Sequence, residues 1–391
     1  MMIKKTLIAT ALVGLFASQT AFASQETQEL RKVIEQQQKV LQDLERRLEA
    51  TETRVERTAD VVEEVAESKS ATTIGGYGEL HYNNITDNKS GNDKKSIDFH
   101  RFVLFFGHEF SEKTRFFSEV ELEHSLSGDG KPGEVELEQA YIEHDFSEML
   151  TAKAGLFLMP VGIINETHEP PAFYGVERNP VEKNILPATW WEAGAALNVK
   201  AAPGLAFDGA ITSGLKVDES YKIRNGRQKV AKADASDLAY TARVKYTGVP
   251  GLELAATAQY QSNVTQSTAG VDTASATLLT AHAIYSIQGF TVKALYAQWD
   301  IDGKEAEALG RDEQNGWYIE PSYRFNESFG LFARYNEYDN NAGNSDDTTI
   351  EQTNVGINYW LHENVVFKAD YEKVGGAKDA DGFNLGVGYQ F

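Results

Sequence analysis

Charged residues alternate with apolar residues along many segments of this sequence, and this spacing indicates where polar chemistry takes place. In the stretch RFFSEVELEHSL, which begins at Arg115, Glu119 and Glu121 flank Val120. Alternate residues of a β-strand point to opposite faces, so such a segment has one charged face and one apolar face. Buried ions need partners, and a face with so many charges is predicted to enclose water rather than a dry core.

The predicted charged face carries similar numbers of bases and acids. Its bases are Arg101, Arg115, Lys153, Lys200, Arg243, Lys245, Lys293, Arg324, Arg334 and Lys368. Its acids are Glu79, Glu119, Glu121, Glu123, Glu143, Glu192, Asp208, Glu253, Glu320, Asp370 and Glu372. Two interpretations stay open, since these residues either act on passing ions or pair with one another to stabilise the wall.

One long connection is rich in prolines and aromatic residues. It runs MPVGIINETHEPPAFYGVERNPVEKNILPATWWEAG from Met159. This composition is typical of a stiff loop, and we expect it to fold into the enclosed space and narrow it. The groups predicted to face the opening are Tyr174, Glu177, Arg178, Glu182 and Lys183. The alternative is an outer loop that packs on its neighbours.

A second connection, KVDESYKIRNGRQKVAKADAS, is basic in an otherwise acidic chain. Its charged residues include Lys216, Lys222, Arg224, Arg227, Lys229 and Lys232. Such a loop can draw anions toward an opening or contact the phosphates of lipopolysaccharide. A solvated charged loop is the alternative.

The sequence shows no pattern typical of catalysis or of metal and cofactor binding. The histidines, at 81, 100, 108, 124, 144, 168, 282 and 362, lack the spacing of metal ligands, and the chain has no cysteine. Nucleophile-elbow, phosphate-loop and dinucleotide motifs are absent. We therefore predict no enzyme activity, no cofactor and no metal. The formal net charge of −21 also argues against binding to nucleic acid.

Sixteen segments with a period of two must position these residues. They start near Ile74, Ile97, Arg115, Val135, Thr151, Trp190, Leu205, Leu238, Leu252, Thr277, Phe290, Trp317, Phe329, Thr353, Val365 and Phe383. Short connections such as SEK, AAPG and HEN alternate with mostly longer polar ones, beginning with NNITDNKSGNDKKS. This alternation is typical of an up-and-down barrel in an outer membrane.

The first residues predict export of the chain. Lys4 and Lys5 precede an apolar run that ends at the small-residue pattern Ala21-Phe22-Ala23, so residues 1–23 are predicted to be a signal peptide. No later run is apolar and long enough for a membrane-spanning helix. Only a closed barrel then satisfies every backbone group within a bilayer. We predict a 16-stranded antiparallel transmembrane β-barrel over residues 72–391, in contact with outer-membrane lipid and lipopolysaccharide.

Residues 24–71 have a different character. Between 26 and 67 aliphatic residues recur in steps of four and three from Leu30 onward, without Gly or Pro. This pattern predicts an α-helical coiled coil followed by a junction, and it favours self-association. A single solvated helix is the alternative.

Several stretches resemble the phosphate-selective porin O and P family. They are ELEQAYIEHDF, AKAGLFLMPVG at the start of the long connection, WWEAGAAL after it, and the terminal GVGYQF. The predicted N-terminal coiled coil is similar to the helical extension of dicarboxylate-type porins, and this resemblance implies that it lies in the periplasm. The resemblance implies a homotrimer of 16-stranded barrels in the outer membrane, each narrowed by its third loop.

The resemblance implies a passive channel for small hydrophilic solutes. Phosphate-selective members line the constriction with arginines, whereas here Arg178 and Lys183 stand among five glutamates between Gly162 and Glu192. We expect a lean toward anions, phosphate-like or dicarboxylate-like, rather than strict phosphate selectivity. A general or cation-preferring porin is one alternative, and a structural tether between the outer membrane and the cell wall is another.

Overall fold

The barrel is a single closed antiparallel sheet in the computed structural model, which describes residues 71–391. Its strands are β1 (Thr72–Asp87), β2 (Lys94–Ser111), β3 (Thr114–Glu123), β4 (Val135–Asp145), β5 (Leu150–Leu158), β6 (Trp191–Ala202), β7 (Leu205–Thr212), β8 (Ala239–Tyr246), β9 (Leu252–Gln261), β10 (Ser275–Ile287), β11 (Phe290–Asp302), β12 (Glu313–Arg324), β13 (Phe329–Asp339), β14 (Ile350–His362), β15 (Val365–Gly376) and β16 (Ala380–Gln390). Each strand pairs with its sequence neighbours, and the predicted sixteen strands are confirmed. The predicted signal peptide and coiled coil lie outside the described residues.

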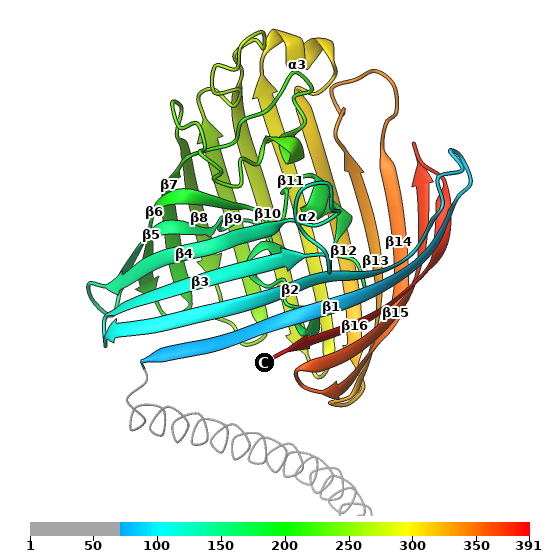
Figure 1. Cartoon of the computed structure of the whole chain (residues 1–391), viewed down its shortest axis with the longest axis horizontal. Helices are drawn as coiled ribbons and strands as arrows, with labels where there is room; N and C mark the ends of the chain where they lie inside the picture. The colour runs from blue at the N-terminus through cyan, green and yellow to red at the C-terminus, as the bar shows by residue number, and fades with distance from the viewer. Residues whose placement is uncertain (1–70) are drawn as a thin grey trace, which may run out of the picture. The chain divides into compact units, whose positions relative to one another are not determined.

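The last strand closes the barrel against the first. β16 pairs with β1 from Tyr77↔Gln390 to Asp87↔Ala380, and Figure 1 shows the two side by side in red and blue. The N–H of Phe391 donates to the carbonyl of Gly76 at 2.9 Å, and the reverse bond has the same length. Closure removes the free sheet edge that a bilayer would leave unsatisfied.

Connections at the two barrel ends differ in length. The short-turn end has two- to five-residue connections, such as 112–113 and 203–204, whereas the long-loop end includes residues 159–190 and 213–238. Two connections of the long-loop end are exceptions, because residues 377–379 join β15 to β16 and residues 88–93 join β1 to β2, which extend to Asp87 and Lys94. The sequence predicts a longer loop between β1 and β2, because the ends of these two strands are polar on both faces. Among the described residues, no helix is both long and apolar enough to span a membrane.

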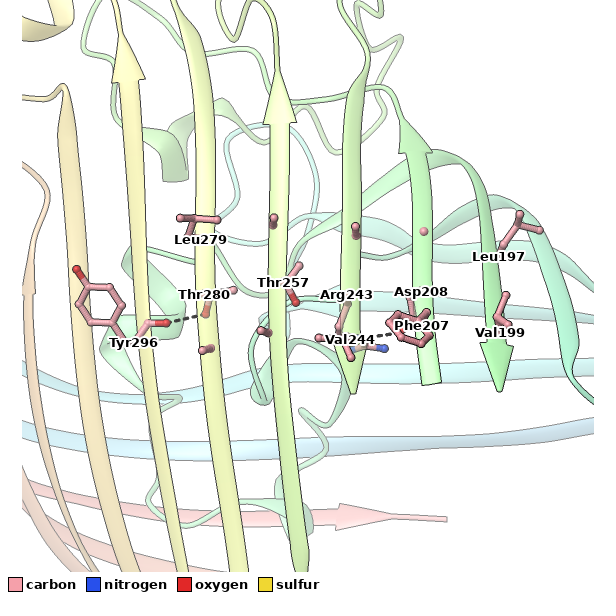
Figure 2. A pocket seen from close by; sticks show the side chains of 15 residues that line it. Leu197, Val199, Phe207, Asp208, Arg243, Val244, Thr257, Leu279, Thr280 and Tyr296 are labelled. Carbon is pink, nitrogen blue, oxygen red and sulfur yellow. Dashed lines mark hydrogen bonds and ion pairs between the residues drawn. The ribbon is translucent and has the colours of Figure 1, made fainter. Parts of the chain in front are cut away.

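Apolar residues face outward and polar residues face inward, the reverse of a water-soluble barrel. On β8, Tyr240 and Val244 are exposed, whereas Thr241 and Arg243 are buried. Leu197, Phe207 and other apolar residues, which Figure 2 shows, line a hollow over β6–β11. Its volume is about 720 Å³. This hollow belongs to the apolar outer face, so we place the polar solute path elsewhere.

Part of the interior is an apolar core. Trp299 of β11 and Leu278 of β10 pack with Phe157, Val181 and Ile185 in one buried cluster. The cluster holds the two long loops, 159–190 and 213–238, against the inner wall. We refer to these segments as the third loop and the fourth loop.

Candidate functional site

The third loop folds inside the barrel and crosses to the opposite wall. At its base, the side-chain amide of Asn165 donates to the carbonyls of Met159 and Trp190, at 2.8 and 2.9 Å. On the far wall, the backbone N–H of Val176 donates to Asp370 Oδ2 of β15 at 2.8 Å. Figure 1 shows α2 (Pro180–Asn184), the helix of this loop, among the strands.

Local sequence explains the course of the loop. Pro180 opens α2, and the side-chain oxygen of Asn179 caps it by accepting from Val181 N at 2.8 Å. The amide of Asn179 also donates to Asn336 Oδ1 on β13 at 2.9 Å. The cap therefore also attaches the helix to the barrel wall.

Glu182, which is predicted to face the opening, is instead a fully buried residue of the third loop. Its carboxylate accepts hydrogen bonds from Ile163 N, Ile164 N and the Tyr318 hydroxyl, at 2.8, 2.7 and 2.7 Å. Burial raises the pKa of this carboxyl although these bonds oppose the shift. The sequence did not reveal this role, because a glutamate in a polar loop is usually solvated.

Tyr174 packs against the wall. Its ring centroid lies 5.5 Å from those of Phe332 and Trp360. Nearby, Arg334 pairs with Glu320 at 3.1 Å and its guanidinium reaches the Tyr174 carbonyl at 3.4 Å. These two predicted site residues fasten the loop to β12–β14.

The last strand leaves space for the loop. A Cβ added to Gly388 would lie 2.3 Å from Pro170 Cβ, and one added to Gly386 would lie 3.1 Å from Val176 Cγ1. Both glycines belong to the inward face of β16. Their missing side chains allow the third loop to lie against the closing seam.

A polar cavity of about 110 Å³ lies between the two loops and β1–β4, and we define it as the constriction. Its acids are Glu79, Glu121, Glu123, Glu136, Glu138 and Glu177, and its bases are Arg101, Arg178, Lys183, Arg224, Arg227 and Lys229. Five of the six acids come from the strands β1–β4, whereas five of the six bases come from the loops. The constriction is thus largely charge-separated, with an acidic wall and a basic loop face that the ion pair of Lys229 with Glu136 joins.

Ion pairs organise the acidic wall. Arg101 lies between Glu79 and Glu121, at 2.8 and 3.3 Å. Beneath them, Glu119 accepts from the Gln139 amide at 2.6 Å and lies 3.3 Å from the His168 ring nitrogen. Arg101 is therefore a partner of the acidic wall rather than a free cation.

The basic face is less fully paired. Arg178 contacts the Thr189 hydroxyl, Arg224 contacts the carbonyls of Lys183 and Ala188, and Arg227 donates to the Thr189 carbonyl at 2.6 Å. Among residues 71–391 these three guanidinium groups form no ion pair with a carboxylate. Buried nitrogens of Arg178 and Arg227 also lack a hydrogen-bond partner there.

The fourth loop contributes Arg224 and Arg227, which the sequence predicts to draw anions toward an opening or to contact lipopolysaccharide, but not to line the constriction. Tyr221 and Ile223 precede them and are fully buried, so they anchor this part of the loop in the core. These apolar residues within a polar stretch are the signal that could have predicted the inward fold. Burial, followed by the nearby charges of Arg227 and Arg178, lowers the pKa of Arg224.

Glu177 of the third loop, unlike the three arginines, has partners of opposite charge. It lies 3.2 Å from Lys94 Nζ and 3.5 Å from a His81 ring nitrogen. Burial alone would raise the pKa of Glu177, but the hydrogen bond and charge of His81, with the charge of Lys94, bring it well below its usual range. Glu177 is the one carboxylate that the third loop adds to the constriction.

The other predicted lumen residues lie on inward positions away from the constriction. Arg243 pairs with Glu166 and with Asp208 at 2.7 Å, and with Lys153 it lines a separate cavity of about 240 Å³. Arg115 pairs with Glu143 and Asp145, Lys245 lies 3.9 Å from Glu253, Lys293 is on β11, Arg324 stacks on Trp360, and Lys368 lies 3.5 Å from the centre of the Phe173 ring. For Arg115, Arg243 and Lys368 these contacts favour the wall-stabilising interpretation.

Comparison with known proteins identifies the group to which this architecture is similar. The family model described as Gram-negative porin matches residues 64–379. An uncharacterized protein of Aquifex aeolicus is 30% identical over 362 residues, which cover 84% of this chain and 82% of that protein.

Solved structures share the fold at low sequence identity. OmpF of Salmonella typhi has a TM-score of 0.60 at 14% identity and covers 82% of this chain and 98% of its own. The anion-selective porin from Comamonas acidovorans has a TM-score of 0.59 at 11% identity, covering 83% and 100%. OmpT of Vibrio cholerae in its trimer form has a TM-score of 0.55 at 12% identity, covering 82% and 100%.

Proposed function

The chain belongs to the Gram-negative porin family, and we propose that this outer-membrane channel passes small hydrophilic solutes with a preference for those that carry anionic groups. The family and the barrel indicate a channel rather than an enzyme. The observation that carries the anionic preference is the cluster of Arg178, Arg224 and Arg227. These arginines reach the constriction from two loops without a carboxylate partner among the described residues.

Guanidinium groups suit carboxylate and phosphate groups because their planar N–H donors match two acceptor oxygens. An arginine already paired with a carboxylate, such as Arg101, would have to exchange partners to hold an anion. The three loop arginines need no such exchange. Phosphate-like and dicarboxylate-like solutes are therefore the proposed substrate class.

A specific observation favours the second candidate, a general or cation-preferring porin. Six carboxylates line the same constriction, and the whole chain has a formal net charge of −21. With six bases opposite six acids, the formal charges of the lining cancel when histidines are neutral. Selectivity then depends on which face the solute path follows, and the unpaired arginines favour the basic face.

The reversal potential across a planar bilayer under a potassium chloride gradient tests the proposal. Wild type is expected to give the anion-selective sign. The triple variant Arg178→Gln, Arg224→Gln, Arg227→Gln is expected to move the reversal potential toward cation selectivity, whereas Lys232→Gln, an exposed charge change in the fourth loop, should leave it unchanged. A cation-selective wild type would refute the anionic preference. A barrel without single-channel current would favour the structural tether.

We also propose a homotrimer surrounded by outer-membrane lipid and lipopolysaccharide. The trimer form of OmpT from Vibrio cholerae, which shares the fold, supports the oligomeric state, and the apolar outer face suits lipid contact. If residues 26–67 form the predicted periplasmic coiled coil, deleting them should weaken assembly without abolishing it. Native electrophoresis of the full-length protein and of the deletion variant measures this, and a monomeric full-length protein would contradict the proposal.

A further inference from the structure

Three histidines and an aspartate gather on the first three strands, toward the long-loop end of the barrel. His81 lies on β1, Asp98 and His100 lie on β2, and His124 directly follows β3. The ladder pairs His81 with Asp98, and a β-bulge between Glu79 and Leu80 leaves His100 as the extra residue of β2. Bulges re-aim side chains, and this one places His100 in the lining of the constriction with His81.

The distances within this group suit shared binding of an ion. The two oxygens of Asp98 lie 3.0 Å from His100 Nδ1 and 2.7 Å from His124 Nδ1. Suitable donor atoms of these three residues all lie within 4.8 Å of one another. Metal–ligand bonds of about 2.0–2.2 Å place neighbouring donors about 3 Å apart, so small adjustments suffice to centre one cation among them.

A second set of donors overlaps the first. His81, His100 and Glu177 also bring their donor atoms within 4.8 Å of one another, so His100 belongs to both sets. The His81 and His100 rings are stacked with centroids 4.6 Å apart. The third loop, which carries Glu177, therefore extends the donor cluster across the constriction.

The backbone at His124 provides independent support. This residue has a φ of 56°, in the left-handed region that non-glycine residues seldom adopt. Its N–H donates to the carbonyl of His100 at 3.1 Å. An unfavourable conformation that directs a ring toward Asp98 and His100 is the kind of local strain found at binding sites.

We propose that Asp98, His100 and His124 bind a divalent transition-metal cation of the zinc class in the channel wall, with His81 and Glu177 as adjacent donors. Imidazole with carboxylate favours such ions over Mg²⁺ and Ca²⁺, which prefer all-oxygen sites. The side chains of the three primary ligands are 23–27% exposed, so a cation in the lumen can reach them. The neighbouring acidic wall attracts cations toward the site.

A bound cation would alter the constriction. It would place positive charge beside Glu79 and Glu123 and weaken the acidic side of the charge separation. Zinc-class ions at the outer entrance would thereby change which solutes the channel favours. The competing explanation is that Asp98 only accepts hydrogen bonds from two imidazoles, and that explanation predicts no selective metal binding.

Isothermal titration calorimetry of the full-length protein in detergent micelles tests the site with Zn²⁺ and with Mg²⁺. We expect saturable Zn²⁺ binding that Mg²⁺ does not reproduce. Replacing residues that only support metal ligands weakens binding by about 10- to 100-fold. The double variant His100→Gln, His124→Gln removes two ligands and should weaken Zn²⁺ binding by at least that factor. His362→Gln, at the last residue of β14, is the matched control and should bind as wild type.

Chemical modification of the wild type gives a readout that needs no variant to fold. Diethyl pyrocarbonate modifies accessible imidazoles, and mass spectrometry locates the modified residues. Zn²⁺ should protect His100 and His124 but leave His362 reactive. Equal responses to Zn²⁺ and Mg²⁺, undiminished binding by the folded double variant, or an absence of selective protection would each overturn the proposal. These readouts measure binding without current, so they stand apart from the test of the channel.

Discussion

Replacing the buried anchor Glu182 should release the third loop while the barrel stays folded. Glu182→Leu keeps a side chain of similar size but removes the acceptor of three hydrogen bonds, two of them from the backbone N–H groups of Ile163 and Ile164. Each buried donor left unsatisfied costs about 1–3 kcal/mol, so the two backbone groups together cost about 2–6 kcal/mol. The strand ladder does not depend on this carboxylate, and the penalty therefore falls on the closed position of the loop.

Hydrogen–deuterium exchange of the peptide that contains Ile163 and Ile164 measures this opening. Since about 1.4 kcal/mol corresponds to a factor of ten, exchange should accelerate by about 30-fold to 20,000-fold in Glu182→Leu. Single-channel recordings should show added current noise as the loop moves within the lumen.

Glu182→Gln is the informative control. Its amide oxygen can accept from both backbone N–H groups, and its NH₂ group can donate to the Tyr318 hydroxyl. It also removes the cost of burying a charge, the effect that raises the pKa of Glu182. We expect Gln to retain the loop. Wild-type exchange in Glu182→Leu, or an equally rapid exchange in Glu182→Gln, would refute the anchoring role.

Two further predictions concern the loop and its surroundings. Gly388→Ala would place a Cβ 2.3 Å from the Cβ of Pro170 and should destabilise the closed loop by about 1–3 kcal/mol. Faster proteolysis within the loop would measure this. In the control Gly209→Ala the added Cβ has no atom within 4 Å, so this variant should behave as wild type. Because contacts with His81 and Lys94 depress the pKa of Glu177, its stabilising contribution should be present above its unfolded value of about 4.3 and be lost as pH falls toward its lower folded value. Wild-type channel currents should thus stay quiet from pH 7 to about pH 4.3 and become noisy below it. The currents of Glu177→Gln should not change across this range, because the variant has no carboxyl group at this position. Noise already present at pH 6 in wild type would contradict this role.

The strands were predictable because each residue of a membrane barrel strand faces either lipid or lumen. That alternation located β8 and β9 to within a residue, starting at Ala239 and Leu252. It failed most at β12, which begins at Glu313 rather than Trp317, because Gln314, Asn315 and Gly316 carry no apolar signal. The inner face of β10 and β11 also departs from the polar pattern, since Leu278 and Trp299 face the loops instead of water.

The site was less predictable because its residues meet only through the three-dimensional pairing of strands and loops. His81, His100 and His124 are far apart in sequence, and the register of β1–β3 and one bulge bring them together. Arg224 and Arg227 depend on the inward fold of the fourth loop, which buried Tyr221 and Ile223 stabilise. Spacing along the chain contains neither kind of information.

The division of charge between wall and loops has a consequence for how the channel can change. Five of the six acids of the constriction occupy strand positions, where an insertion or deletion would shift the register and turn inward residues outward. Arg178, Lys183 and Arg227 lie on loops held by side-chain contacts, so their positions can change without disturbing the ladder. Loop substitutions therefore give separate control over the basic face, and the strength of the field across the constriction can be tuned while the acidic wall stays fixed.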